Sequence, residues 1–170
     1  PLRELYTTFI QSHRRDGLQS LLGKFPVLGR FIGTVVALWH QGSLEMLQRI
    51  QADRPTLEAR FSIPREWALQ TVQQGLSDPH RGGRAVAIPG FASQDGAETR
   101  QLVYKPKEMG VDAAYQALID ELNAHSALPP LRSLAVHAAD GYGYMEHVPH
   151  KLSSDGNELD RFYRNAGRLT

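Results

Sequence analysis

The sequence contains no cysteine among its 170 residues. This absence excludes a disulfide framework and a zinc site built from thiolates, and it fits a reducing compartment. Long hydrophobic runs are absent as well, because the longest apolar stretch, residues 31–39, is too short to span a bilayer. We therefore expect a cytoplasmic protein that has no membrane partner.

An excess of either charge is also lacking. The 19 basic and 18 acidic residues give a formal net charge of +1 and are spread along the whole chain. A nucleic-acid surface or a polybasic membrane tail requires a concentration of basic residues, so neither is expected. The chain is long enough for one ordinary domain with a sizeable core, since 41% of its residues are hydrophobic.

Both ends of the sequence indicate a piece of a longer protein. The chain begins at Pro1 without a methionine. It stops at Thr170 within the amphipathic pattern of residues 157–170, NELDRFYRNAGRLT. We expect that further residues follow this pattern in the complete protein.

The first part of the chain, residues 2–61, is predicted to be helical because its apolar residues recur at helical spacing. Breaks are expected at the turn-forming residues 15–17 (RDG), 25–26 (FP) and 40–43 (HQGS), where Ser43 is a candidate helix cap. We interpret the apolar stripes of these helices as core rather than as part of a cofactor site.

After residue 66 the pattern indicates β structure. Residues 84–91 (RAVAIPGF) and 99–105 (TRQLVYK) read as two antiparallel strands, and Asp95-Gly96 between them is a hairpin signal. Residues 129–150 predict a second hairpin around the turn ADGYG.

Between the two hairpins, residues 111–125 predict a helix. One face carries Val111, Tyr115, Leu118 and Leu122, and Asp112 is placed to cap the helix N-terminus or to complement its dipole. The order is thus strand, strand, helix, strand, strand, as in the small lobe of a protein kinase. The predicted fold class is α+β.

Lys105 ends the strand in LVYKPK, residues 102–107. Strand alternation places Gln101, Val103 and Lys105 on one face, and Leu102 and Tyr104 on the other. A lysine in that position suits nucleotide phosphates. A lysine that merely snorkels at a strand end is the alternative, and the residues of this strand by themselves favour it.

A second group of chemically active residues lies in GLSDPHRGGRAV, residues 75–86. Asp78 and His80 flank a proline and precede Gly82 and Gly83. Such a loop can bring its backbone close to a phosphate while it carries an acid/base pair. A turn that opens a hairpin, with His80 at the surface, is equally compatible with the pattern.

Histidine is plentiful, with seven residues, and EHVPH groups Glu146 with His147 and His150. This stretch reads as strand and loop, whereas the spacing of metalloproteases requires a helix. No metal site is predicted.

Six segments together resemble, in order, the dehydratase region of class II lanthipeptide synthetases. The combination of the DPH…GG loop, the YKPK strand and the GYGY-x-E strand is specific, and the match runs from near Leu2 to the last residue. The segments are LYTTFI, FPVLGRFI, GLSDPHRGGRAV, LVYKPKEMGVDAAYQALIDELNAH, GYGYMEHVPH and RFYRNAGRLT.

The resemblance implies a large enzyme with a lipid-kinase-like N-terminal half, which has extra helices, and a zinc-dependent cyclase as its C-terminal half. Residues 1–66 would be the helical extension, residues 67–150 the kinase-like small lobe, and residues 151–170 the truncated start of the large lobe. Residues 145–148 (MEHV) would then be the crossover between lobes, where the backbone meets adenine.

In that family the dehydratase uses ATP and Mg²⁺ to phosphorylate Ser and Thr of a precursor peptide. It then eliminates phosphate to leave dehydroalanine or dehydrobutyrine, to which the cyclase adds cysteine thiols. The implied partners are a precursor with a leader and a Ser/Thr/Cys-rich core, and the remainder of the synthetase. The metal ligands of the dehydratase lie outside this segment, and zinc belongs only to the cyclase, which is absent here.

Carried over by residue, Lys105 corresponds to the phosphate-binding lysine. Asp78 and His80 correspond to an acidic residue and a histidine that are linked to elimination. Glu121 is the candidate ion-pair partner of Lys105, and Glu146 is its rival. Because the family's metal-binding and catalytic-loop residues are absent, we expect the segment to be inactive alone; the alternative is a non-catalytic kinase-like module that binds a peptide or a partner.

Overall fold

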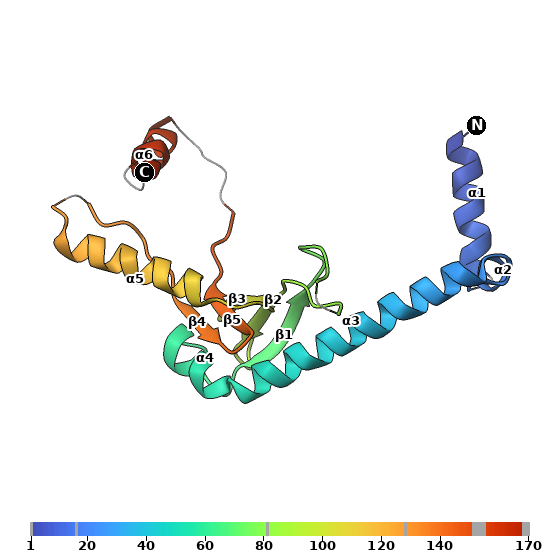
Figure 1. Ribbon diagram of the computed structural model, residues 1–170, viewed down its shortest axis with the longest axis horizontal. Helices are drawn as coiled ribbons and strands as arrows, with labels where there is room; N and C mark the ends of the chain where they lie inside the picture. The colour runs from blue at the N-terminus through green and yellow to red at the C-terminus, as the bar shows by residue number, and fades with distance from the viewer. Residues whose placement is uncertain (1, 16, 81, 128, 151–155, 168–170) are drawn as a thin grey trace. The chain divides into compact units, whose positions relative to one another are not determined.

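The computed structural model describes all residues except 1, 16, 81, 128, 151–155 and 168–170. It confirms the α+β class (Figure 1). The elements in chain order are α1 (Leu2–Arg15), α2 (Gln19–Lys24), α3 (Pro26–Ala52), α4 (Arg54–Phe61), β1 (Ala68–Gln73), β2 (Ile88–Ala92), β3 (Thr99–Lys105), α5 (Gly110–His125), β4 (Val136–Ala139), β5 (Tyr142–Glu146) and α6 (Gly156–Ala166).

The chain forms two compact units. The smaller comprises residues 1–49 and 80–84, and the larger comprises residues 50–79 and 85–170. Within the segment predicted as the start of a large lobe, the structure describes α6, while residues 151–155 and 168–170 lie outside the described residues. None of the helices in the described ranges has the length and apolar character needed to cross a membrane.

A five-stranded antiparallel sheet of order β1-β2-β3-β5-β4 forms the centre of the larger unit. Both predicted hairpins are present, β2–β3 and β4–β5. Asp95 accepts hydrogen bonds from the Ser93 hydroxyl and the Ala97 amide at 2.6 and 3.1 Å, which shapes the first turn. In the second turn Gly141 has a φ of 76°, a conformation that favours glycine.

Strand β1 was not among the predicted elements. Its sequence, ALQTVQ, is short and partly polar, and only Leu69 and Val72 are half-buried while the other four residues are exposed. An edge strand of this kind contributes little apolar periodicity, so its pairing with β2 is the main evidence for it.

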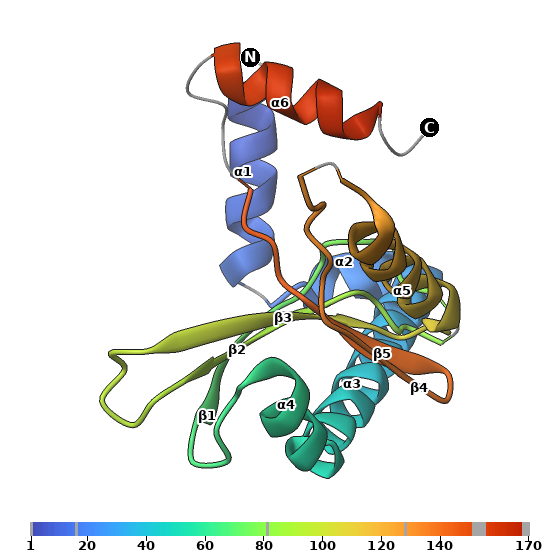
Figure 2. The same ribbon diagram turned by 90° about the vertical axis from the view of Figure 1, so that its left-hand side faces the viewer.

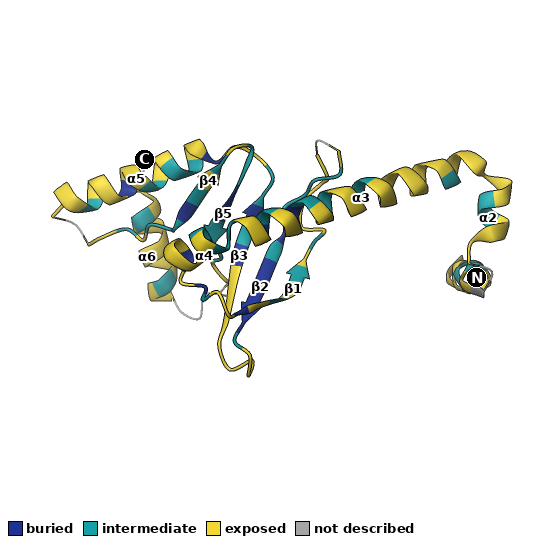
Figure 3. Ribbon diagram, turned by 90° about the horizontal axis from the view of Figure 1, so that it is seen from below, coloured by how far each residue is buried: buried dark blue, intermediate teal, exposed yellow. Residues whose placement is uncertain are grey.

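Helices α4 and α5 lie on opposite sides of the sheet, as both Figure 1 and Figure 2 show. The side chains of β3 and β5 that face α4 include Leu102, Tyr104 and Tyr144, which are all buried. Figure 3 shows this burial concentrated on the central strands, whereas α5 and α6 are mainly exposed. The largest part of the core of the larger unit therefore lies between the sheet and α4, while Met109 and Ile119 are buried on the α5 side.

The GYGY segment that begins at Gly141 has a clear structural basis. The hydroxyl groups of Tyr142 and Tyr144 donate to the same carboxylate oxygen, Oδ2 of Asp53, at 2.8 and 3.0 Å. Burial and the charge of Asp53 raise the pKa of Tyr144, so its hydroxyl acts as a neutral donor. A Cβ at Gly143 would clash with the backbone carbonyl oxygen of His137 and would lie 2.9 Å from the sulfur of Met109, so only glycine fits at this position.

Residues 40–43 do not interrupt the helix, contrary to the sequence prediction. Helix α3 is continuous from Pro26 to Ala52, and Ser43 is an interior residue rather than a cap. Gly42 has another role, because a Cβ there would lie 3.1 Å from the carbonyl oxygen of Gly83 in the loop that packs against α3. The break occurs instead at Asp53, with Pro55 in the first turn of α4.

The prediction that the helical stripes form core is wrong for most of their residues. In α3, Phe31, Val35 and Trp39 are more than half exposed, at 66%, 63% and 55%. The described part of the smaller unit contains only α1, α2, most of α3 and one loop, which offer little surface to bury such stripes. Met46, at 3% exposure, is a buried exception.

Candidate functional site

Lys105 occupies the end of β3, as predicted, and the alternation along this strand is confirmed. Leu102 and Tyr104 are buried against the α4 side, and Val103 and Lys105 are half-buried on the α5 side. The Lys105 ammonium donates to Oδ1 of Asp112 at 2.9 Å, and its side chain is 21% exposed. The strand thus aims a fixed cation at the start of α5.

Asp112 is positioned by the connection between β3 and α5. Met109 is the N-cap residue of α5 and is fully buried, while Asp112 lies in the first turn, where a carboxylate interacts favourably with the helix dipole. Lys107, which is 57% exposed, also reaches Asp112, at 3.3 Å. Burial raises the pKa of Asp112, but hydrogen bonds and charges from Lys105 and Lys107 outweigh this effect and lower it overall.

The ion-pair partner of Lys105 is therefore Asp112 rather than Glu121 or Glu146. Glu121 lies nine residues after Asp112, about 2.5 turns, which places it on the opposite side of α5 from Lys105. It is exposed and pairs with His125 at 3.2 Å. Glu146 pairs with Arg132. The sequence marked Asp112 only for its place at the helix N-terminus.

The loop that contains Gly82 and Gly83 is closed by backbone hydrogen bonds. His80 and Arg84 form a two-residue antiparallel bridge, with N···O distances of 2.8 and 2.9 Å. Gly82 and Gly83 have φ values of 83° and 87°, and a Cβ at Gly83 would lie 2.7 Å from Leu38 of α3. These glycines serve the turn and its packing on α3; the approach of a phosphate to their backbone stays a prediction.

Arg84 anchors this loop to α3 within the smaller unit. Its Nε donates to Glu45 at 2.6 Å, and Glu45 also pairs with Arg49 at 2.5 Å. The hydrogen bond from Arg84 lowers the pKa of Glu45 despite partial burial. The ion pair holds the end of the loop that follows the two glycines.

Asp78 and His80 are both exposed. Asp78 belongs to the larger unit and His80 to the smaller one. Within the described parts of the larger unit, no hydrogen bond or ion pair joins Asp78 to Lys105. The predicted grouping of Asp78, His80 and Lys105 stays a prediction.

The sheet face around Lys105 combines a fixed cation with an apolar surface. A lysine ammonium has three donors, and Asp112 occupies one of them, so the others are available to phosphate oxygens. Val103 and Met145 pair across β3 and β5 on the same face and are half-buried, which provides an apolar surface beside the cation. Gly143, opposite Lys105, is covered on this face by the buried side chain of Met109.

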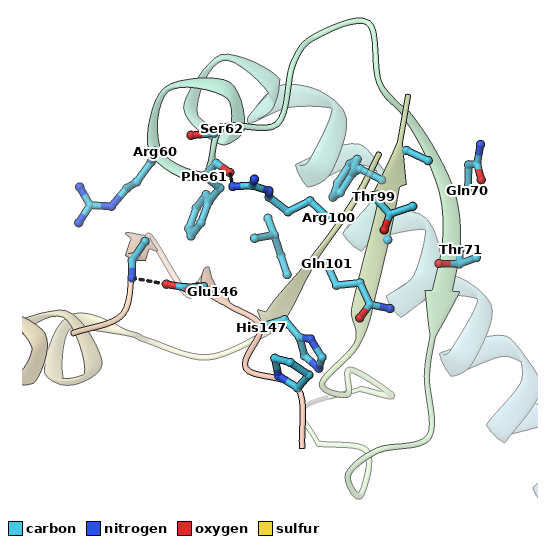
Figure 4. A pocket seen from close by; sticks show the side chains of 16 residues that line it. Arg60, Phe61, Ser62, Gln70, Thr71, Thr99, Arg100, Gln101, Glu146 and His147 are labelled. Atoms are coloured by element: carbon cyan, nitrogen blue, oxygen red, sulfur yellow. Dashed lines mark hydrogen bonds between the residues drawn. The ribbon is translucent and has the colours of Figure 1, made fainter. Parts of the chain in front are cut away.

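A recess of about 750 Å³ lies further along β3 in the larger unit (Figure 4). Its walls come from the end of α4, the strands β1 to β3, and the residues that follow β5. Figure 4 shows Phe61, Arg100, Gln101, Glu146 and His147 around it. The sequence did not indicate this recess, because its residues are scattered over the chain.

No metal cluster was predicted. In the ranges that the structure describes, no three His, Asp or Glu side chains gather closely enough to hold a metal ion. Glu146 is engaged with Arg132, and no such group includes His147 or His150.

A known family matches most of the chain. The sequence model of a family described as "Domain of unknown function (DUF4135)" matches residues 25–170. This range includes the loop with Asp78 and His80 and the strand with Lys105. No curated protein matches the chain.

The Lys105–Asp112 pair predicts a pH dependence of stability. Because the pKa of Asp112 is lowered in the folded chain, its ion pair stabilises the fold fully above its unfolded pKa of about 3.8. This contribution is lost as the pH falls through the lower folded value. Denaturant unfolding of wild type and Asp112→Asn should therefore differ most near neutral pH and converge in acid. A constant difference across this range would contradict the ion pair.

Proposed function

Because the chain belongs to the DUF4135 family, we propose that it is part of the dehydratase of a class II lanthipeptide synthetase. The family is associated with lanthionine synthetase-like proteins. The matched range contains the DPH…GG loop, the YKPK strand and the GYGY segment, on which the resemblance to these dehydratases depends.

The proposed reaction has two steps. The first transfers the γ-phosphoryl group of ATP to a Ser or Thr hydroxyl of a precursor peptide, which loses its proton, and ADP leaves. In the second, a base takes the proton from the α-carbon, its electron pair forms a C=C bond, and the C–O bond breaks to release phosphate. Phosphorylation helps because phosphate leaves far more readily than hydroxide.

The observation that carries this proposal is the anchored position of Lys105. Its ammonium lies at the end of a central strand and is held by Asp112 at 2.9 Å, with donors left for a ligand. A preoriented cation stabilises the charge of a transferring or departing phosphate without reorganisation. A lysine that merely snorkels into solvent would not need a half-buried carboxylate partner.

Asp78 and His80 supply proton transfer in the elimination step. Histidine has an unperturbed pKa of about 6.5, so it can accept and return protons at neutral pH. Both side chains are exposed, so a peptide can reach them.

ATP is the proposed cofactor, together with Mg²⁺, whose ligands belong to other parts of the synthetase. ATP supplies the phosphoryl group. Lys105 would hold its phosphates, and Val103 and Met145 offer an apolar surface on the same sheet face. The remaining partners are the precursor peptide and the rest of the enzyme, without which we propose that the segment is inactive.

The alternative function is a kinase-like module that binds a peptide or a partner without chemistry. One observation favours it: the predicted apolar face of α5 is open, with Val111, Tyr115 and Leu118 at 84%, 46% and 54% exposure. Exposed apolar faces of this kind are typical of interaction surfaces. A measurement of dehydration separates the two functions.

Lys105→Ala should impair dehydration of a precursor peptide in the complete synthetase. We expect a loss of about a hundredfold or more, the usual effect of removing one electrostatic stabiliser. Mass spectrometry follows the loss of water from the peptide. Lys107→Ala is the matched control, since Lys107 contacts the same carboxylate but is 57% exposed, and it should retain most activity. Wild-type dehydration by Lys105→Ala would rule out the proposed role.

Asp78→Ala and His80→Ala should block elimination rather than phosphorylation. The expected product is a precursor that carries phosphate on Ser or Thr, visible as a gain in peptide mass instead of a loss. Asp120→Ala, an exposed substitution on α5, serves as the control and should give ordinary dehydrated peptide. If the Asp78 and His80 variants also give dehydrated peptide at the normal rate, their assignment to elimination is wrong.

A further inference from the structure

Strand β3 changes its neighbours along its length. Its last four residues, from Leu102 to Lys105, pair with β5. Its first three, Thr99, Arg100 and Gln101, pair with β2 on one side only. On the β5 side, no described strand pairs with them, because β5 ends at Glu146 opposite Leu102. Figure 2 shows the β2–β3 hairpin extending past the end of β5.

The alternation of backbone groups identifies which atoms face this open side. The N–H and C=O of Tyr104 both bond to Ala87 on the β2 side, at 2.8 and 3.1 Å, and the C=O of Glu98 accepts from Ser93 on that side at 3.0 Å. Residues of odd number therefore direct their backbone groups the other way. Thr99 and Gln101 thus present two N–H and two C=O groups to the open edge.

The recess beside this edge is positively charged. Arg60 donates through Nε to the carbonyl of Val136 at 2.5 Å, and Arg100 donates through Nη1 to the carbonyl of Phe61 at 3.0 Å. Each guanidinium has five donors, and in the described chain neither pairs with a carboxylate. The one acidic side chain that lines the recess, Glu146, is neutralised by Arg132.

We propose that this edge binds an extended acidic peptide segment, which adds as a strand beside residues 99–101 and places carboxylates against Arg60 and Arg100. Arg100 lies on the α4 side of β3, so a side chain of an added strand that points to this face would reach it, and Arg60 borders the same recess beside Val136 of β4. Main-chain hydrogen bonds provide affinity in this mode, and the arginines select acidic residues.

The recess has the size of a specific binding site, since pockets that enclose ligands usually measure about 300–1,000 Å³. Lys105 is at the opposite end of β3 and faces the other side, so the edge is separate from the phosphate site. The inference rests on the proposed function only for the source of the peptide, a segment of the precursor. Binding itself needs no turnover, so its failure and the failure of the proposed chemistry are distinguishable.

The first test uses the wild-type chain and a short fluorescent peptide of alternating glutamate and threonine. Anisotropy should show binding that is about tenfold or more tighter than that of a lysine/threonine peptide of equal length. Methylation of alternate backbone nitrogens, which removes the strand hydrogen bonds and keeps the charge, should weaken binding by a similar factor. Equal binding of the methylated or the lysine peptide would overturn the proposal.

Variants of the recess provide the second test. Arg60→Gln and Arg100→Gln should each weaken binding of the glutamate peptide about tenfold, the effect of losing one charge-assisted contact. Arg65→Gln is the matched control, because Arg65 is 68% exposed and lies outside the recess. Circular dichroism checks that each variant is folded. If folded Arg100→Gln binds as tightly as Arg65→Gln, the site is wrong.

Discussion

Strand β3 is the constraint on which the larger unit depends. Because its side chains alternate between faces, Leu102 and Tyr104 complete the core under α4 while Val103 and Lys105 form the opposite face. Its backbone pairs with β2 at one end and with β5 at the other. A shift of one residue in this register would bury Lys105 and expose Tyr104. The register of β3 therefore determines both the core and the candidate site.

The Lys105–Asp112 pair also sets how the site can act. At 2.9 Å the carboxylate orients the ammonium, yet it offsets part of the positive charge that a phosphate would meet. Lys107 contacts the other oxygen of Asp112 at 3.3 Å, but its side chain is 57% exposed, so solvent screens most of its charge. Lys105 can therefore bind an anion without giving up its partner, because the ammonium has further donors.

Local patterns predicted much of this arrangement. Alternation placed Lys105 and Val103 together, and the turn residues at Asp95-Gly96 and around Gly141 located both hairpins. Helix periodicity predicted α5 to within one residue of its start. These features depend on neighbours in sequence, which a pattern can report.

What could not be predicted depends on contacts between distant residues. Gly42 was predicted to be part of a helix break, but α3 continues through it. Its lack of a side chain instead allows the loop at Gly83 to approach α3. Asp53 accepts a hydrogen bond from the hydroxyl of Tyr142, which is 89 residues away in the sequence, and no local pattern indicates that bond. The recess at Arg60 and Arg100 exists because β3 extends beyond the end of β5. Only the pairing register of β3 with its two neighbours shows this.

The central claim is that Lys105 contacts the phosphates of a nucleotide. The most direct test labels lysine amines of the complete synthetase with an acylating reagent, with and without MgATP, and measures modification by mass spectrometry. Lys107, which is on the same segment and more exposed, provides an internal reference. The account predicts that MgATP protects Lys105 much more than Lys107. Equal labelling of Lys105 in both conditions, in an enzyme that is shown to bind ATP, would contradict it.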